Sequence, residues 1–295
     1  MLAASIRFVN LGIEIESLPK TFNLFGLEVA FYGLIIAIGM FLAMMLAFHE
    51  AKVTGQDVDM YYDFAIWLIV CSVVGARLYY VIFQWEQYKD NLLEIFNLRS
   101  GGLAIYGGIL TGIITAIIYA KVKKQNFWQL ADVAIVSVLV GQMIGRWGNF
   151  FNREAYGGYT DGLFAMQIRL DEAGGVVTEE LLSHLAVVDG ISYIQVHPTF
   201  LYESLWNLGL FILILIFRRR KKFEGEVFAW YAIGYGIGRF IIESLRTDQL
   251  LLPIVNIPVS QVVSIGMILA GIIIEVLGRK KKLYKAPDST EQVKE

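Results

Sequence analysis

The chain has 295 residues, of which 56% are hydrophobic and 18% are charged, and its formal net charge is -2. Soluble domains carry about 45–50% apolar and about 25% charged residues, so this composition argues against an ordinary soluble domain and favours one helical bundle with lipid as its solvent. The single cysteine, Cys71, excludes a disulfide framework within the chain and argues against a cysteine-based zinc site.

The N-terminal residues 1–28 mix charged and apolar side chains. Glu14, Glu16 and Lys20 interrupt any continuous apolar stretch of the kind that a secretory signal needs. We therefore interpret this segment as an ordered or interfacial extracytoplasmic tail that is not removed.

Seven apolar segments follow, each close to the ~20 residues that a helix needs to cross a bilayer. They predict an all-α polytopic membrane protein with a transmembrane domain over residues 29–278 and a C-terminal tail over 279–295. The predicted spans are 29–49, 63–84, 102–121, 129–150, 199–217, 225–245 and 258–278.

Basic residues set the expected orientation. They gather in 121–124, in 218–222 and in 279–282, which follow alternate spans and therefore share one side. Lysine and arginine are enriched in cytoplasmic loops. We expect the N-terminus outside and the C-terminal tail in the cytoplasm.

The longest connection, residues 151–198, then lies outside the cell. It is rich in Gly, Asp, Glu and Thr, and its segments 164–169 and 194–196 have the composition of strands. We expect a small extracytoplasmic α+β head between the fourth and fifth spans.

Three arginines, Arg77, Arg146 and Arg239, interrupt apolar spans. An arginine at the centre of a spanning helix costs about 2.5–3.5 kcal/mol, and is tolerated near a helix end, in a wet cavity or opposite an anion. One such arginine can be explained by snorkelling or by a structural ion pair. Several at one depth, among other polar groups, favour a site.

The end of the fourth span carries a polar stripe. At 100° per residue, Gln142, Arg146 and Asn149 share one face of the helix, and Asn152 and Glu154 follow where the helix is expected to end. Guanidinium and amide groups are donors suited to a phosphate or to glycerol hydroxyls. Glu154 would hold the arginine in place or act as an acid or base.

The end of the sixth span carries a second polar face, with Tyr235, Arg239, Glu243 and Arg246 within about 80° of one another. Arg239 and Glu243 have the i,i+4 spacing of a local ion pair, which leaves a purely structural pair as an alternative. We expect Arg246 to leave a local excess of positive charge, which argues against that alternative.

Both polar ends lie on the predicted outer side. Tyr32 at the start of the first span, the run 101–108 and the run 197–203 lie at the same depth. Arginines and amides without a carboxylate cluster indicate an anionic ligand, and the abundant anion in that leaflet is a phospholipid head group. We find no His/Asp/Glu set at metal-ligand spacing, and no Gly-x-Ser-x-Gly nucleophile motif.

The run 145–157 resembles the signature of the bacterial prolipoprotein diacylglyceryl transferase family, Gly-Arg-x-Gly-Asn-Phe-x-Asn-x-Glu-x-x-Gly. The run 197–203, the pair Tyr32 and Gly33, the run 75–77 and the spacing of the sixth-span residues are also similar to that family. The resemblance covers about residues 25–280 and leaves out the lysine-rich tail.

This resemblance implies transfer of the diacylglyceryl group of phosphatidylglycerol to the lipobox cysteine thiol of a prolipoprotein. A thioether would form and glycerol 1-phosphate would leave. It implies a bacterial cell membrane protein whose partners are phosphatidylglycerol, prolipoprotein lipobox peptides and membrane lipids, with no nucleic acid, metal or organic cofactor.

The resemblance also implies roles for individual residues. Arg146 and Arg239 would hold the phosphate and stabilise charge on the leaving group. Glu154 and Glu243 would orient these arginines. The other substrate-binding residues that it implies are Asn149, Asn152, Gly157, Tyr32, Tyr235, Arg246 and His197.

One position departs from the family pattern. Many members have a histidine, proposed as the base for the thiol, where this chain has Tyr106. A phenol with a pKa near about 10 is a poor base at neutral pH, although nearby arginines would lower it. Tyr106, a carboxylate, arginine-held water or ionisation of the thiol by the positive site all remain open.

Two other classes of protein are alternatives. Buried arginines equally suit an anion or lipid transporter, but the sequence lacks internal repeats and its polar groups gather on one side rather than along a path. An alcohol phosphotransferase would need an aspartate-rich metal motif, and the sequence has none.

Overall fold

The computed structural model describes residues 5–98, 101–253 and 255–281. The chain divides into two compact units. Unit 1 combines residues 1–43 with 135–295, and unit 2 consists of residues 44–134. Two long helices, α1 (Phe31–Val53) and α4 (Phe127–Asn152), each contribute residues to both units.

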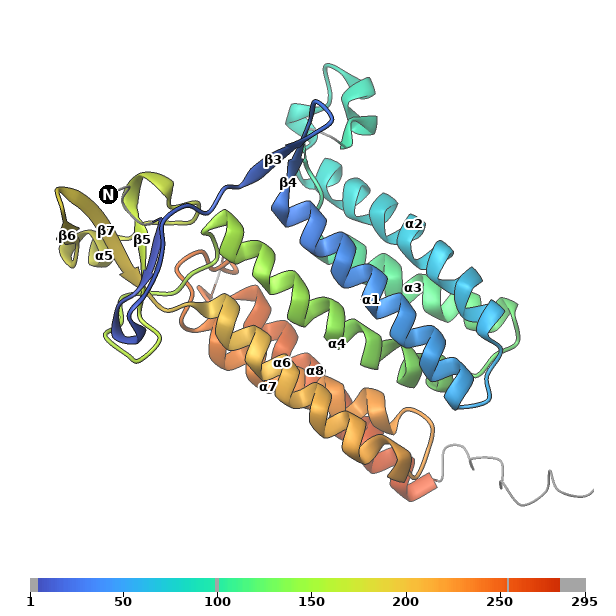
Figure 1. The fold of residues 1–295 in the computed structure, drawn as a ribbon. Helices are drawn as coiled ribbons and strands as arrows, with labels where there is room; N and C mark the ends of the chain where they lie inside the picture. Colours follow the sequence, from blue (N-terminus) through green and yellow to red (C-terminus); the bar gives the residue numbers. More distant parts are fainter. Residues whose placement is uncertain (1–4, 99–100, 254, 282–295) are drawn as a thin grey trace, which may run out of the picture. The chain divides into compact units, whose positions relative to one another are not determined.

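In unit 1, α6 (Thr199–Phe217) and α7 (Glu226–Glu243) contact the C-terminal part of α4, and α8 (Val259–Lys281) packs against α7 (Figure 1). Small residues allow α7 and α8 to approach closely. A Cβ atom added to Gly236 would lie 2.9 Å from the Ser264 carbonyl oxygen, and one added to Gly271 would lie 2.8 Å from the Ala229 carbonyl oxygen. Such small-residue contacts are typical of helices packed in membranes.

In unit 2, α2 (Val58–Phe83) packs against α3 (Ile105–Val122). A Cβ atom at Gly107 would lie 2.5 Å from the Gly75 carbonyl oxygen, so the two helices touch through glycine. In its described residues, the connection between them contains the short 3-10 helices η2 (Trp85–Gln87) and η3 (Leu92–Phe96).

A five-stranded antiparallel sheet forms the head of unit 1, in the order β2-β1-β5-β7-β6. Ile6 of β1 pairs with Ile168 of β5, so the N-terminal residues join a sheet whose other strands come more than 150 residues later. The strands are β1 (Ile6–Phe8), β2 (Ile13–Ile15), β5 (Met166–Arg169), β6 (Ala186–Val188) and β7 (Ile191–Val196).

The head has its own hydrophobic core. Ile6, Ile168, Leu181 and Ile194 are fully buried in it, and Leu181 comes from the short helix α5 (Glu179–Ser183). The remaining elements of unit 1 are the hairpin β3–β4 and three 3-10 helices. Their bounds are β3 (Thr21–Leu24), β4 (Leu27–Ala30), η1 (Val9–Leu11), η5 (Leu170–Glu172) and η6 (Arg218–Arg220).

The long helices occur where the apolar segments predict them, with ends that differ by a few residues. Within the described residues, six of them (α1, α2, α3, α4, α6 and α8) are long and apolar enough to cross a membrane. Helix α7 has 18 residues and contains Glu226, Arg239 and Glu243, which lower its apolar character. The strands expected within 164–169 and 194–196 are confirmed as β5 and part of β7.

Candidate functional site

Two arginines from different helices of unit 1 meet on one glutamate. Arg146 of α4 places Nη2 2.6 Å from Oε2 of Glu203, and Arg239 of α7 places Nη1 2.8 Å from Oε1 of the same carboxylate. Glu203 lies in the second turn of α6 with 4% of its side chain exposed. A guanidinium bound to each oxygen gives this buried carboxylate a partner on both sides and fixes both arginines.

Arg239 has further partners that hold its other edge. Its Nη2 atom lies 2.5 Å from Oε2 of Glu243, one helical turn later, and 3.2 Å from the Ser260 hydroxyl oxygen of α8. The i,i+4 pair expected from the sequence therefore forms. Because Glu203 and Ser260 come from other helices, the pair is part of a network that joins α6, α7 and α8.

Arg246 does not leave the local excess of positive charge expected from the sequence. Its guanidinium forms a two-pronged pair with Asp248, with distances of 2.9 Å from Nε to Oδ1 and 2.8 Å from Nη2 to Oδ2. Arg246 is also 4.0 Å from Glu243. Glu203, Glu243 and Asp248 thus balance Arg146, Arg239 and Arg246. Burial alone would lower the pKa of Arg246. Its bond to Asp248 and the neighbouring carboxylates outweigh burial, so the pKa is raised overall and the guanidinium stays charged.

The amides at the end of α4 belong to a local turn. The Asn149 side chain donates to Oε1 of Glu154 at 3.0 Å, and the Glu154 backbone N–H donates to the Asn149 carbonyl, also at 3.0 Å. Asn152 is the last residue of α4. In the contacts of the described residues, Glu154 pairs with Asn149, and Glu203 takes the place expected for Glu154 beside Arg146.

The segment after α4 forms backbone contacts with His197 and with the residues that follow α7. The Gly157 N–H donates to the His197 carbonyl at 2.9 Å, and Gly157 forms a β-bridge with Arg246. A Cβ atom at Gly157 would lie 2.6 Å from the Leu245 carbonyl oxygen, so this crossing requires glycine. The expected residues Gly157, His197 and Arg246 therefore lie together, where the segment after α4 passes between the segments that precede α6 and follow α7.

His197 precedes α6, and its Nδ1 atom lies 3.2 Å from the Tyr202 hydroxyl. Burial lowers the pKa of His197. The imidazole is therefore neutral at pH 7, where it can donate through one nitrogen and accept through the other.

The expected tyrosines of unit 1 occupy helix contacts. The Tyr32 ring of α1 fills the space beside Gly148, where a Cβ atom would lie 2.7 Å from the ring. Tyr235 stacks on Tyr231 with ring centroids 5.3 Å apart, and the Tyr231 hydroxyl accepts from the Gln142 amide at 2.9 Å. Gln142, which shares the polar stripe of α4, therefore binds α7.

Tyr106 lies in the first turn of α3, in unit 2. Its part in the site stays a prediction. In the described part of the chain, no group of three or more His, Cys, Asp or Glu side chains is placed to hold a metal ion.

Glu203 and Ser260 were missed as site residues by the sequence analysis. Glu203 does carry a signal, because it is a carboxylate close to the start of an apolar span and follows the polar residues His197 and Tyr202. Ser260 is a common residue in the first turn of a helix and carries none.

Long apolar helices that end in a buried network of arginines and carboxylates define a multi-pass membrane protein. The chain belongs to the prolipoprotein diacylglyceryl transferase family, whose family model matches residues 19–277.

Curated relatives agree along nearly the whole chain. The chain is 43% identical over 260 residues to the phosphatidylglycerol–prolipoprotein diacylglyceryl transferase of Clostridioides difficile, covering 88% of this chain and 95% of that protein. It is 44% identical over 263 residues to the enzyme of the same name from Listeria welshimeri, covering 89% and 90%. The corresponding enzyme of Bacillus cytotoxicus is 44% identical over 252 residues, covering 85% and 88%.

Proposed function

We propose that this protein transfers the diacylglyceryl group of phosphatidylglycerol to the lipobox cysteine thiol of prolipoproteins, the first step of bacterial lipoprotein maturation. The names of its relatives support this activity. The single structural observation that carries it is the meeting of Arg146 and Arg239 on Glu203, because it gathers two guanidinium groups where one lipid phosphate can reach both.

The reaction breaks one bond and forms one. The cysteine sulfur attacks the glyceryl carbon that carries the phosphate, a C–S bond forms, and the C–O bond to the phosphate breaks. The oxygen leaves with the electron pair as part of glycerol 1-phosphate, and the thiol gives up its proton to a base. Negative charge therefore grows on the phosphate, where guanidinium groups stabilise it most.

Glu203 prepares the site for this charge. While the site lacks substrate, its carboxylate balances Arg146 and Arg239 and holds their planes in place. A phosphate that approaches these guanidiniums enters a site whose donors are already oriented, so little reorganisation is needed in the transition state. Glu203 acts through the arginines and is a positioning residue.

The other expected residues surround this pair in the proposed mechanism. Asn149 and Asn152 bind glycerol or phosphate oxygens, and Glu154 holds the Asn149 amide, which supports this role for Asn149. Glu243 orients Arg239. The proposed substrate-binding set also includes Tyr32, Gly157, His197, Tyr235 and Arg246. The base for the thiol proton is left open between Tyr106, a carboxylate and water held by an arginine.

The proposed setting is the bacterial cell membrane, with seven crossings that include α7. The N-terminus and the head over 151–198 lie outside, and the tail over 279–295 lies in the cytoplasm. Helix α7 packs along α8 through Gly236 and Gly271, which supports its place within the bundle. The chain has no organic or metal cofactor in this proposal.

The test uses purified protein, phosphatidylglycerol and a lipobox peptide, with the peptide mass as readout. We expect a gain of one diacylglyceryl group, with release of glycerol 1-phosphate. Arg146→Ala and Arg239→Ala should each reduce the rate at least ~100-fold, as loss of one charge-stabilising donor does in other enzymes.

Arg169→Ala is the matched control, because Arg169 pairs with Asp171 on the head surface, away from the arginine pair. It should keep the rate within about twofold. Movement of lipid or solute across liposomes without any change in peptide mass would contradict the proposal and favour a transporter. Equal rates for Arg239→Ala and Arg169→Ala would contradict the assignment of the site.

A further inference from the structure

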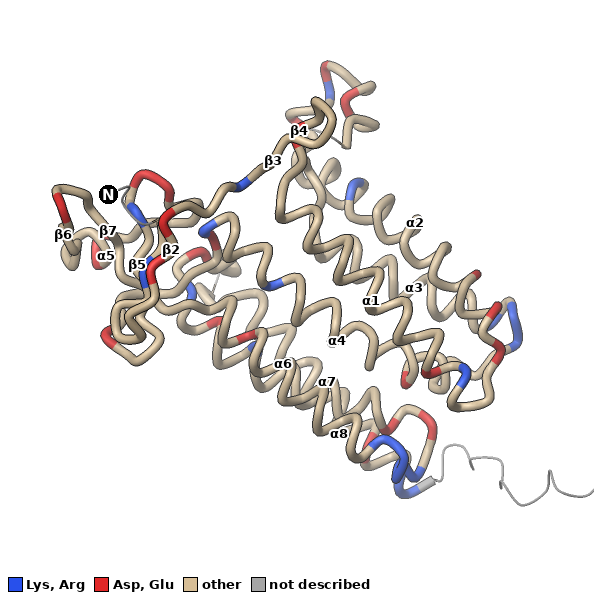
Figure 2. The backbone as a smooth tube through the Cα atoms, viewed as in Figure 1, with Lys and Arg blue, Asp and Glu red and all other residues tan. Residues whose placement is uncertain are grey.

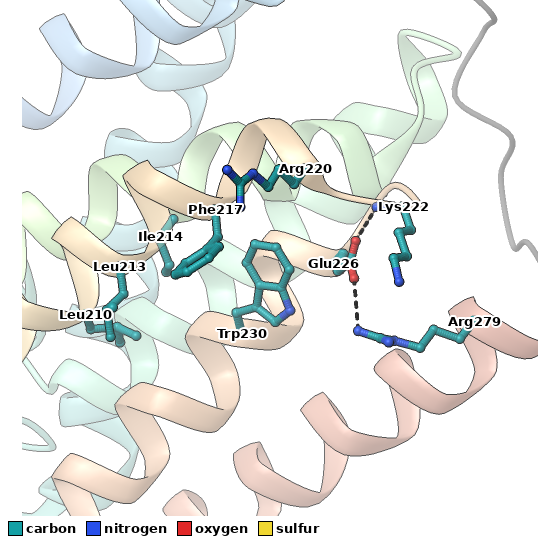
Figure 3. Close-up of a pocket in the computed structure, with 9 residues that line it drawn as sticks. All are labelled: Leu210, Leu213, Ile214, Phe217, Arg220, Lys222, Glu226, Trp230 and Arg279. Atoms are coloured by element: carbon teal, nitrogen blue, oxygen red, sulfur yellow. Dashed lines mark hydrogen bonds and ion pairs between the residues drawn. The ribbon is translucent and has the colours of Figure 1, made fainter.

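A groove of about 330 Å³ lies at the other end of α6 from Glu203 (Figure 3). The end of α6, the start of α7 and the end of α8 form it, and all three elements belong to unit 1. Its lining residues are Leu210, Leu213, Ile214, Phe217, Arg220, Lys222, Glu226, Trp230 and Arg279.

The groove changes from apolar to cationic along the helix axis. Leu210, Leu213 and Phe217 of α6 line its inner part together with Trp230, and Arg220 and Lys222 follow where α6 has ended. Ten residues separate Leu210 from Arg220, which corresponds to ~15 Å at helical rise. Figure 2 shows a group of basic residues at this end of α6 and α8.

The buried carboxylate in the groove is already satisfied. Glu226 is 1% exposed, accepts a hydrogen bond from the Lys222 backbone N–H and faces Nη2 of Arg279 at 3.5 Å. Arg279 also pairs with Glu275. Glu226 therefore holds the chain after α6 and the end of α8 in place, and adds little negative charge to the mouth of the groove.

The other two cations at the mouth keep their charge uncompensated. Among the described residues, no carboxylate pairs with the side chain of Arg220 or Lys222. The Arg220 guanidinium lies 6.0 Å above the Phe217 ring, which is itself 44% exposed. Two such cations beside an apolar groove, at the edge of membrane-spanning helices, have the chemistry that binds the head group of an anionic lipid.

We propose that this groove binds one anionic phospholipid of the bilayer. Its phosphate lies between Arg220 and Lys222, and one acyl chain lies along Leu210, Leu213 and Trp230. The site is separate from the arginine pair, because Glu203 and Phe217 are 14 residues apart on one straight helix, or ~20 Å. Its lipid is therefore a bound partner and not the substrate, and the inference stands without the proposed transferase activity.

Native mass spectrometry of the full-length protein tests the charge requirement. The protein carries Arg239→Gln to remove lipid at the arginine pair, and the probes are dioleoyl phosphatidic acid and dioleoyl phosphatidylcholine. We expect one phosphatidic acid to bind at least tenfold more tightly than phosphatidylcholine. Adding Arg220→Gln and Lys222→Gln should raise the Kd for phosphatidic acid at least tenfold. The matched control, Arg219→Gln with Lys280→Gln, removes two exposed charges at the same end outside the groove and should leave the Kd within about twofold.

A second pair of variants tests the acyl slot without changing charge. Leu213→Trp fills the groove, whereas Ile216→Trp changes an equally exposed residue of α6 that does not line it. We expect only Leu213→Trp to weaken phosphatidic acid binding. Equal weakening by both tryptophans, equal weakening by both charge pairs, or equal affinity for the two lipids would overturn the proposal. The readout is lipid binding alone, in protein that lacks Arg239, so the result is independent of the proposed transfer activity.

Discussion

Two sites of this protein place arginines within apolar helices, and they satisfy the guanidinium groups with different partners. In unit 2, Arg77 of α2 is 5% exposed and donates to five backbone carbonyls, those of Glu94, Ile95, Asn97, Gly101 and Gly102, at 2.6–3.0 Å. In unit 1, Arg146 and Arg239 pair with carboxylates, chiefly with the shared Glu203.

The partners decide what each arginine can do. Carbonyls of the connection between α2 and α3 use every donor of Arg77, and another ligand could bind only by breaking that loop. The carboxylate between Arg146 and Arg239 is a counter-ion that another anion can outcompete or join. A guanidinium that holds backbone is structural, whereas a pair that shares one side-chain anion is suited to a ligand.

The largest effect is expected at Arg77. Arg77→Leu would leave buried carbonyls without donors, and we expect it to reduce the free energy of unfolding by about 3–5 kcal/mol. Thermal unfolding in detergent measures this. Arg77→Lys keeps the charge but lacks the planar fork, so it should recover only part of the loss. Full stability in Arg77→Leu would show that the carbonyl cage is not structural.

The next largest effect is expected where α7, the helix of Arg239, packs against α8. In Gly236→Ala, the new Cβ atom would lie 2.9 Å from the Ser264 carbonyl oxygen, so α7 and α8 must separate. We expect a loss of about 1–3 kcal/mol in unfolding experiments, with a lower transfer rate because Arg239 moves with α7.

Gly266→Ala provides the control for this packing effect. It lies on α8 in open space and should be neutral or stabilising by up to ~1 kcal/mol, because alanine favours helix. Equal losses in the two alanine variants would mean that close approach of α7 and α8 is not what places Arg239.

Glu203→Gln separates positioning from charge at the arginine pair. The amide keeps the shape but removes the negative charge, so glycerol 1-phosphate should bind about tenfold more tightly, or ~1.4 kcal/mol. The turnover number should fall, because the two guanidiniums lose the anion that holds them. Product-inhibition and kcat measurements check both effects. If Glu203 were purely structural, Glu203→Gln would lower stability and leave the product affinity unchanged. Glu172→Gln in the head is the control and should show that behaviour.

The difference between the two arginine sites could not be predicted from the sequence. Arg77, Arg146 and Arg239 all look alike as charges within apolar segments. Local periodicity did predict the helices and the stripe of α4, since both depend on residues a few positions apart. The partners of the arginines depend on contacts between helices far apart in the chain, and Glu203 is 57 residues from Arg146 and 36 from Arg239.

The head shows the same limit. Its strands β5 and β7 have local patterns that indicate extended structure. The pairing of Ile6 with Ile168 joins two distant parts of the chain, and no short pattern specifies that register. Charge balance at the site is also partly a property of the fold, since Arg239 finds Glu203 on another helix. Asp248, by contrast, lies two residues after Arg246 and is a local partner.

The smallest expected effect is the dependence of stability on pH that His197 causes. Burial lowers the pKa of His197 in the folded protein, so the unfolded chain binds more protons as the pH falls below about 6.5. Stability should therefore decrease between about pH 6.5 and the lowered folded pKa, and stop decreasing below it. His197→Gln should flatten this part of the pH–stability curve, whereas His184→Gln, at an exposed position of the head, should leave the curve unchanged. Equal slopes for wild type and His197→Gln would mean that the His197 ring does not resist protonation. The His197–Tyr202 pair would then not be neutral, and charge at this end of the bundle would not be limited to the arginines and their carboxylates.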